Sequence, residues 1–248
     1  GSRVYSASRC GCEFLLSMVL EGFREELQGA LSPLRAVPAR WSLMLVGAMA
    51  APHLLYAYIW QYPSEFKRRS SRFPLSALGE TAVDVMHKLV IGIKAMQLAS
   101  VLAWCEWGLL PACDAAPTGR WAVLNAVRTA APARWILGLA FLIPGQALNI
   151  GIYNAIGRNG VYYGIKISDE KIPWVTGFPF NVGLRHPQYV GAMLSWTGIF
   201  ALLAATPATV APFGMVLAGW TGLYYATALH EATSDGDSEA PAQRGNHV

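Results

Sequence analysis

The sequence predicts an all-α integral membrane protein: a helical bundle of about five membrane helices, the last two forming a hairpin, preceded by an amphipathic helix. Three observations lead to this prediction. The 248 residues are 54% hydrophobic and only 14% charged, well below the charge content of an average soluble domain. The apolar residues gather in long blocks, and the longest block, residues 189–229, is about twice the length of one membrane span. A polar, basic and proline-broken stretch, residues 178–191, leads into that block.

The first 40 residues are expected to form an N-terminal segment of their own. Within it, residues 13–29 carry apolar side chains at helical spacing, with charged side chains on the opposite face. A helix of this length and polarity is expected to lie on a membrane surface rather than to cross it. Pro33 and Pro38 follow and end the predicted helix.

Three single spans are expected next, over residues 41–62, 89–110 and 135–156. Aromatic residues at both ends of the first span are typical of the membrane interface. In the second span, Lys94 is close enough to one end to snorkel towards water. Neither Lys94 nor Glu106, near the other end, needs a catalytic explanation, and the connection 111–134 that follows is predicted to be a plain loop.

The long block over residues 189–229 predicts two helices rather than one. Pro207 and Pro212 interrupt it near the middle. Two helices of about 17 residues would each rise about 26 Å, just enough to cross the apolar core of a bilayer. A hairpin of this kind returns His230 and Glu231 to the membrane face from which the block started.

Arg185 and His186 stand at the start of that hairpin, directly before Pro187. Proline suits the first turn of a helix, because its missing N–H has no partner there. Arg185 and His186 are therefore expected at the positive end of a helix, where an anion is favoured. The alternative is an interfacial anchor, since arginine often flanks membrane spans.

The charge and cysteine patterns exclude some classes of function. The net charge of +4 is small and occurs in local clusters, which favours lipid head groups over nucleic acid as partners. One cluster, Lys67, Arg68 and Arg69, is either a topology signal or a contact to lipid phosphates. Cys10 and Cys12 have no second pair at zinc spacing, so no metal site is expected.

Several motifs together resemble phospholipid N-methyltransferases. The main ones are FPFN at residues 178–181 and a Pro-x-Tyr-x-Gly run at residues 187–191. The likeness covers residues 41–232 and includes PHLLYAYIWQYPSEFKRRSSRF (52–73), GVYYGI (160–165) and LHEA (229–232). The stretch RHPQYVG (185–191) also resembles the wider superfamily of membrane methyltransferases, including isoprenylcysteine carboxyl methyltransferases. It resembles membrane sterol reductases more weakly.

The resemblance implies S-adenosylmethionine-dependent methylation of phosphatidylethanolamine derivatives towards phosphatidylcholine, carried out by a membrane domain over residues 41–232. The residues that the motifs assign to the cofactor are Gly138, Ala140, Arg185, His186, Tyr189, Gly191 and Glu231. The expected catalytic residues are His186 and Glu231; either of them, or water, would accept the proton of the lipid amine. The expected substrate-binding residues are Lys67, Arg68, Arg69 and Asn181.

Three positions depart from the family's pattern. Gly138-Leu139-Ala140 stands where the family usually has Gly-x-Gly, and on spacing alone Gly138 is a helix-packing residue. Glu231 is followed by Ala232, where the family has a second glutamate. Arg185-His186 stands where close phospholipid relatives often have Asp-Asn.

The expected partner is a phospholipid within the bilayer. The expected location is the endoplasmic reticulum membrane, or alternatively a mitochondrial or plastid membrane. A weak excess of Lys and Arg on the side of the connections 63–88 and 157–188 places the candidate site in the cytosol. Residues 233–248 are expected to form a disordered polar tail. Three alternatives stay open: another membrane methyltransferase, an NADPH-dependent membrane sterol reductase, and a structural membrane protein or small transporter that binds no cofactor.

Overall fold

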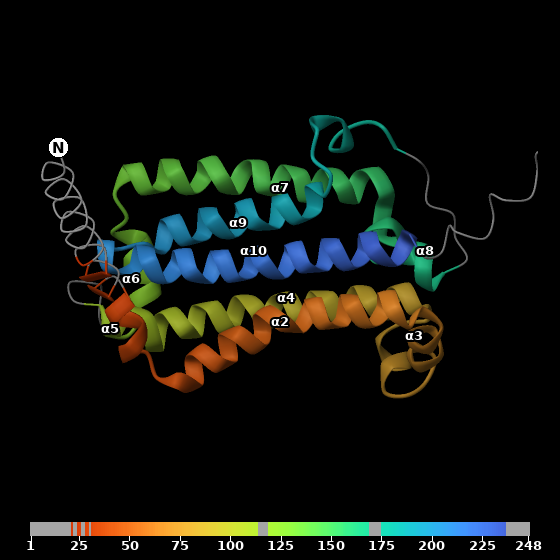
Figure 1. Cartoon of the computed structure of the whole chain (residues 1–248), viewed down its shortest axis with the longest axis horizontal. Helices are drawn as coiled ribbons and strands as arrows, with labels where there is room; N and C mark the ends of the chain where they lie inside the picture. Colours follow the sequence, from red (N-terminus) through yellow and green to blue (C-terminus); the bar gives the residue numbers. More distant parts are fainter. Residues whose placement is uncertain are drawn as a thin grey trace, which may run out of the picture.

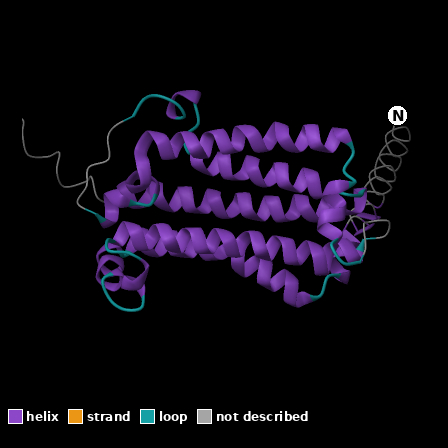
Figure 2. Cartoon of the chain, turned by 180° about the vertical axis from the view of Figure 1, so that it is seen from behind, coloured by secondary structure: helices purple, strands orange, loops and turns teal. Residues whose placement is uncertain are grey.

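The computed structural model describes residues 31–113, 119–168 and 175–236, together with residues 21, 24, 25, 28 and 29. Its longest helices run side by side along one axis (Figure 1). They are α2 (Ala39–Gln61), α4 (Ala82–Trp104), α7 (Pro132–Val161), α9 (Pro187–Leu203) and α10 (Pro207–Gly236). No strand occurs in the described part of the chain (Figure 2), so the predicted all-α bundle is confirmed.

Short helical elements fill the connections. They are α3 (Pro63–Ser70), a 3-10 turn (Leu75–Leu78), a π-helical turn (Cys105–Leu109) leading into α5 (Leu110–Ala112), α6 (Ala122–Arg128), α8 (Gly164–Ile167) and a second 3-10 turn (Phe180–Val182).

Helix α6 lies in the segment that the sequence predicted to be a plain loop, and Glu106 explains why a helix forms there. The Glu106 carboxylate accepts hydrogen bonds from the backbone N–H groups of Trp121, Ala122 and Val123, at 2.7, 3.0 and 2.8 Å. These are N–H groups at the start of a helix, which have no partner within the helix itself. A carboxylate at this end is also favoured by the helix dipole. Glu106 therefore has a structural role.

Among the described residues, three helical stretches are long and apolar enough to cross a membrane: Ala39–Gln61, Ala82–Ala112 and Pro132–Ile167. They overlap the three single spans that the sequence predicts. Helices α9 and α10 lie alongside them and run antiparallel to each other (Figure 1). The break falls just before Pro207, whereas Pro212 lies inside α10. The chain therefore folds as an apolar, membrane-type bundle that includes the predicted hairpin.

The ends of the chain are described only in part. Helix α10 continues to Gly236, past the boundary predicted at residue 232. The remainder of the predicted tail lies outside the described residues. So does most of the predicted amphipathic helix, although Glu21, Arg24 and Glu25 are helical and exposed.

Helices α7 and α9 pack with their backbones in direct contact, along a seam of glycines. A Cβ on Gly145 would lie 2.8 Å from the carbonyl oxygen of Gly191, and a Cβ on Gly191 would lie 2.9 Å from that of Gly145. Further along, a Cβ on Gly198 would lie 2.5 Å from the carbonyl oxygen of Gly138. Small residues at matching positions are the usual way for membrane helices to approach closely, where water provides no hydrophobic driving force.

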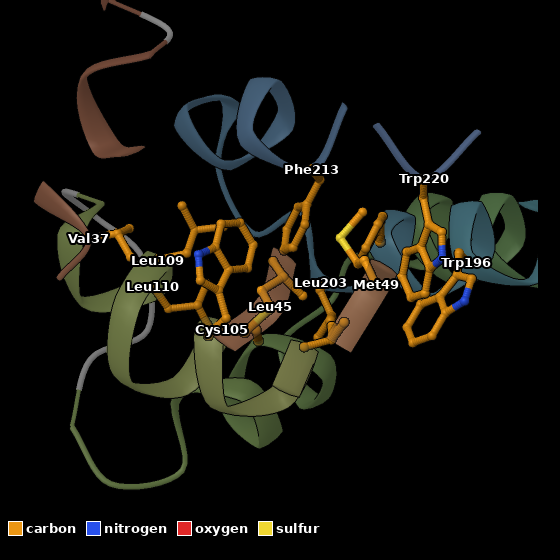
Figure 3. Close-up of a cluster of buried hydrophobic side chains, with 14 of the residues drawn as sticks. Val37, Leu45, Met49, Cys105, Leu109, Leu110, Trp196, Leu203, Phe213 and Trp220 are labelled. Carbon is orange, nitrogen blue, oxygen red and sulfur yellow. The ribbon is translucent and has the colours of Figure 1, made fainter. Parts of the chain in front are cut away.

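Aromatic packing fixes the same hairpin at the end of the bundle near the 204–206 connection (Figure 3). The ring centroids of Trp196 and Trp220 are 4.4 Å apart, and those of Phe200 and Phe213 are 4.8 Å apart. These rings belong to a buried cluster that also includes Leu45 and Met49 of α2 and Leu109 of the π-helical turn, with other buried side chains. Because this end is fixed by packing, the polar residues at the opposite end of α9 and α10 have a defined position.

The close approach of α7 and α9 at the glycine seam predicts how an added methyl group changes the stability of the bundle. Gly198→Ala should lower the stability of the bundle by about 1–3 kcal/mol, because the added methyl group would meet the backbone of α7. The matched control is Gly219→Ala on α10, where a Cβ meets nothing within 4 Å. Thermal unfolding in detergent, followed by circular dichroism, measures both variants. Equal unfolding midpoints for the two variants would contradict close α7–α9 packing.

Candidate functional site

A pocket of about 170 Å³ lies at the end of the bundle where α9 begins and α10 approaches its end. It is lined by residues from five parts of the chain: Tyr56, Ile152, Ile156, Gly160, Val161, Tyr162, Tyr163, Phe180, Arg185, His186, Pro187, Gln188, Tyr189 and Glu231. Aromatic and aliphatic side chains form most of the wall. A guanidinium, an imidazole, a carboxylate and several phenols converge on it, and this combination is typical of a ligand site.

Glu231 joins three elements at this pocket. Its Oε1 accepts hydrogen bonds from the hydroxyls of Tyr163 and Tyr189, both at 2.6 Å. Tyr163 caps α8 in the left-handed conformation (φ 56°), after the helical chain has been broken at Gly157 (φ 64°, ψ −175°). A positive φ of this kind is easily adopted by glycine. The break at Gly157 therefore lets the chain turn back so that Tyr163 reaches α10.

Arg185 and His186 approach the same pocket from the loop before α9. Pro187 is the first residue of α9, as predicted, and His186 is its N-cap residue. Arg185 is exposed, whereas His186 is half-buried and stacks on the Tyr189 ring at 5.5 Å between centroids, with 14° between the planes. The pocket is therefore lined by a cation, a helix N-terminus and a carboxylate.

A second cavity of about 430 Å³ continues from this pocket into the bundle. Both spaces are lined by Tyr56, Ile152, Val161, Tyr162, Gln188 and Tyr189. The second cavity is mostly apolar, but Lys94 of α4, Gln146 and Asn149 of α7 and Tyr224 of α10 contribute polar groups. A ligand with a polar and an apolar part could therefore occupy the two spaces together.

A larger groove of about 1300 Å³ lies between α2, α4 and α6, away from this polar end. Its lining is largely apolar and includes Trp41, Trp107 and Trp121. Glu106 also lines it but is occupied in capping α6. The groove lacks the convergent polar groups of the first pocket, which is therefore the better candidate site.

The structure brings four of the predicted site residues together: Arg185, His186, Tyr189 and Glu231 all line the first pocket. Gly191 lies about one turn after Pro187, the first residue of α9, and packs against Gly145 and Asn149 of α7. The hairpin thus joins the two separated sequence motifs at one site, as the sequence predicts.

Two predicted cofactor residues lie elsewhere. Gly138 is buried against Leu202 and Gly198, about 16 Å along α9 from its first residue. Ala140 is exposed on α7. Neither lines either of the two spaces. The small size of Gly138 is explained by helix packing, which is the role that spacing alone suggests.

The predicted substrate-binding residues are also outside both spaces. Lys67, Arg68 and Arg69 lie on α3, where Arg68 and Arg69 pair with Glu65. Hydrogen bonds from Arg69 and Arg68 lower the pKa of the Glu65 carboxyl. Asn181 is exposed in the turn Phe180–Val182.

Sequence reasoning missed Tyr163, Tyr224 and the role of Lys94. The sequence predicts that Lys94 snorkels towards water, but its Nζ instead donates a hydrogen bond to the Tyr224 hydroxyl at 2.9 Å and lines the second cavity. A charged residue within a membrane span is itself a signal of function. The tyrosines carry no such signal, since tyrosine is common at membrane interfaces.

An apolar helical bundle of this kind defines a membrane protein, and the polar pocket lies at one end of the bundle. The model of the phospholipid methyltransferase family matches residues 133–231, which hold most of this site. This part of the chain is therefore similar to the phospholipid methyltransferase family.

Three curated relatives match shorter stretches. Phosphatidyl-N-methylethanolamine N-methyltransferase of Arabidopsis thaliana is 51% identical over 51 residues, which are 21% of this chain and 30% of the relative. Human phosphatidylethanolamine N-methyltransferase is 35% identical over 98 residues, 40% of this chain and 46% of the relative. Phosphatidyl-N-methylethanolamine N-methyltransferase of Saccharomyces cerevisiae is 38% identical over 97 residues, which are 38% of this chain and 42% of the relative. The chain thus spans less than half the length of each of these relatives. No solved structure matches the chain significantly.

The two hydrogen bonds to Glu231 predict coupled effects on stability. Tyr163→Phe or Tyr189→Phe alone removes one donor, whereas the double variant leaves the carboxylate without either hydroxyl. An unsatisfied buried charged group costs about 1–3 kcal/mol or more, so the double variant should lose about 0.5–3 kcal/mol beyond the sum of the single losses.

Denaturation in mixed micelles measures the free energy of unfolding of the wild type, the two single variants and the double variant. Tyr225→Phe, an exposed tyrosine on α10, is the matched control and should change nothing. Strictly additive losses would mean that the two tyrosines do not share the Glu231 carboxylate.

Proposed function

We propose that the protein is a membrane enzyme that transfers methyl groups from S-adenosylmethionine to the amine of phosphatidylethanolamine derivatives, the monomethyl and dimethyl forms, towards phosphatidylcholine. The observation that carries the proposal is the convergence of Arg185 and Glu231 on one pocket within the region of the family match. The names of the relatives from three organisms support the same reaction class.

The residues of the first pocket fit the polar groups of S-adenosylmethionine. The cofactor has a carboxylate, an ammonium and two ribose hydroxyls. Arg185 offers a guanidinium, which binds a carboxylate through two parallel hydrogen bonds. Glu231 offers an acceptor for the hydroxyls or the ammonium. Tyr189 and His186 present aromatic faces at the same pocket.

S-adenosylmethionine supplies a methyl group bound to a positively charged sulfur. In the transfer, the bond from the lipid nitrogen to the methyl carbon forms while the sulfur–carbon bond breaks. Charge moves and is not created, so the main tasks of the chain are to position the amine and exclude water. The amine must first lose its proton, and His186, Glu231 or a water molecule would accept it.

The lipid is expected to reach the site from within the bilayer, because the site belongs to a bundle of apolar helices long enough to cross a membrane. We place the enzyme in the endoplasmic reticulum membrane with the site facing the cytosol. The basis is the resemblance to phospholipid methyltransferases and the distribution of basic residues between the two sides.

Arg185→Ala and Glu231→Ala should each weaken the binding of S-adenosylmethionine about tenfold or more, because each removes a charged partner of the cofactor. Arg72→Ala and Glu80→Ala, two exposed residues outside the pocket, are the matched controls. Calorimetric titration of purified protein measures the affinity. Unchanged affinity in both site variants would remove both residues from the cofactor site.

If His186 is the base, His186→Ala should lower kcat by about 10²–10⁴-fold while the affinity for S-adenosylmethionine changes little. The rise of the rate with pH that reports loss of a proton from the base should also disappear. Rate profiles between pH 5 and 9, with labelled cofactor and each phospholipid acceptor in turn, measure this. Profiles of the same shape in wild type and variant would argue against His186 as the base.

A further inference from the structure

Lys94 is a basic side chain inside a membrane helix, and it faces a cavity instead of an aqueous edge. It lies about 18 Å along the axis of α4 from Ala82, the first residue of the helix. Its Nζ donates to the Tyr224 hydroxyl at 2.9 Å and lies 5.6 Å from the centre of the Tyr224 ring. In the described part of the chain, no carboxylate forms an ion pair with Lys94. A charge at such a depth is costly, so it needs a functional explanation.

The second cavity opens sideways, between α4 and α7. Leu98 of α4 and Tyr153 of α7 line it, and they are 44% and 42% exposed to the surroundings of the bundle. Gln146 lies on the same side, is exposed, and donates a hydrogen bond to Ser195 at 2.8 Å. Amide and ammonium groups therefore line a cavity whose rim is exposed on the side of the bundle.

The cavity leads from Lys94 to the candidate site. Tyr224, the partner of Lys94, packs on Tyr189 with 5.1 Å between ring centroids. Tyr189 lines both spaces and donates to Glu231. A molecule that enters between α4 and α7 would therefore meet Lys94 before it reaches Glu231.

We propose that Lys94 holds the phosphate of a phospholipid whose head group enters the second cavity and whose acyl chains leave between α4 and α7. That the lipid is the methyl acceptor rests on the function proposed above. A lysine ammonium binds phosphate as a compact point charge. The amine, two carbons beyond a phosphate oxygen, then extends towards Tyr189.

This assignment replaces the basic run of α3 as the phosphate contact. Arg68 and Arg69 are paired with Glu65, and Arg158 is paired with Asp84 at 2.7 Å. None of these arginines lines either space. Lys94, by contrast, lines the second cavity.

The test compares lipid binding by the purified full chain in a phosphate-free detergent. The probes are dioctanoyl phosphatidyl-N-methylethanolamine, dioctanoylglycerol, which lacks the phosphate, and glycerophospho-N-methylethanolamine, which lacks the chains. Wild type should bind the phospholipid at least about tenfold more tightly than either other probe. Lys94→Met should remove the preference over dioctanoylglycerol, and Lys94→Arg should keep part of it. Lys88→Met, an exposed lysine at the start of the same helix, is the matched control and should bind like wild type.

Two outcomes overturn the proposal: Lys94→Met binds the phospholipid as tightly as wild type, or glycerophospho-N-methylethanolamine alone binds as tightly as the phospholipid. Titration with S-adenosylmethionine shows whether Lys94→Met is folded, because its affinity should equal that of wild type. The two proposals fail separately. Lysine-dependent lipid binding without methyl transfer by wild type would refute the proposed function alone, and methyl transfer with an unchanged lipid KM in Lys94→Met would refute the phosphate contact alone.

Discussion

The carboxylate of Glu231 is the contact on which the candidate site depends. Its Oε1 accepts from two tyrosine hydroxyls that come from different parts of the chain, one at the cap of α8 and one in the first turn of α9. A half-buried carboxylate needs such donors, because water is partly excluded from it. The same two hydrogen bonds therefore satisfy the charge and hold three elements around the pocket. The remaining carboxylate oxygen and the nearby Arg185 guanidinium are what a ligand with both charges would contact.

The rest of the fold positions this contact from a distance. The glycine seam sets how closely α9 approaches α7. The ring contacts Trp196–Trp220 and Phe200–Phe213 fix α10 against α9. The ring contacts and the Gly138–Gly198 contact lie towards the opposite end of the hairpin, whereas the Gly145–Gly191 contact lies near the pocket. Helices are stiff, so fixing them there also determines where Tyr189 and Glu231 meet. Catalytic geometry in this protein would therefore be sensitive to packing far from the pocket.

The sequence predicted the long helices and the hairpin, because apolar length and proline position are local properties that a membrane makes decisive. It also predicted that Arg185 and Glu231 lie at the same end of the bundle, because an antiparallel pair of helices returns the chain to the face from which it started. It failed for α6, whose first N–H groups are bound by the Glu106 side chain from the π-helical turn that precedes it. It did not predict that Gly138 and the basic residues of α3 lie outside the two spaces, because a motif or a charge does not reveal which face of a helix is covered. Lys94 was misread for the same reason: its direction is set by Tyr224, about 130 residues away.

The proposed function requires that one pocket, between the start of α9 and the end of α10, binds the methyl donor. Photolabelling with S-adenosylmethionine carrying a tritiated methyl group tests it most directly, since ultraviolet light attaches the bound cofactor to the residues around it. After proteolysis, label is expected in peptides that contain residues 185–191 or 224–231. Label that falls instead in the groove between α2, α4 and α6, or that is not displaced by excess unlabelled cofactor, would contradict the account.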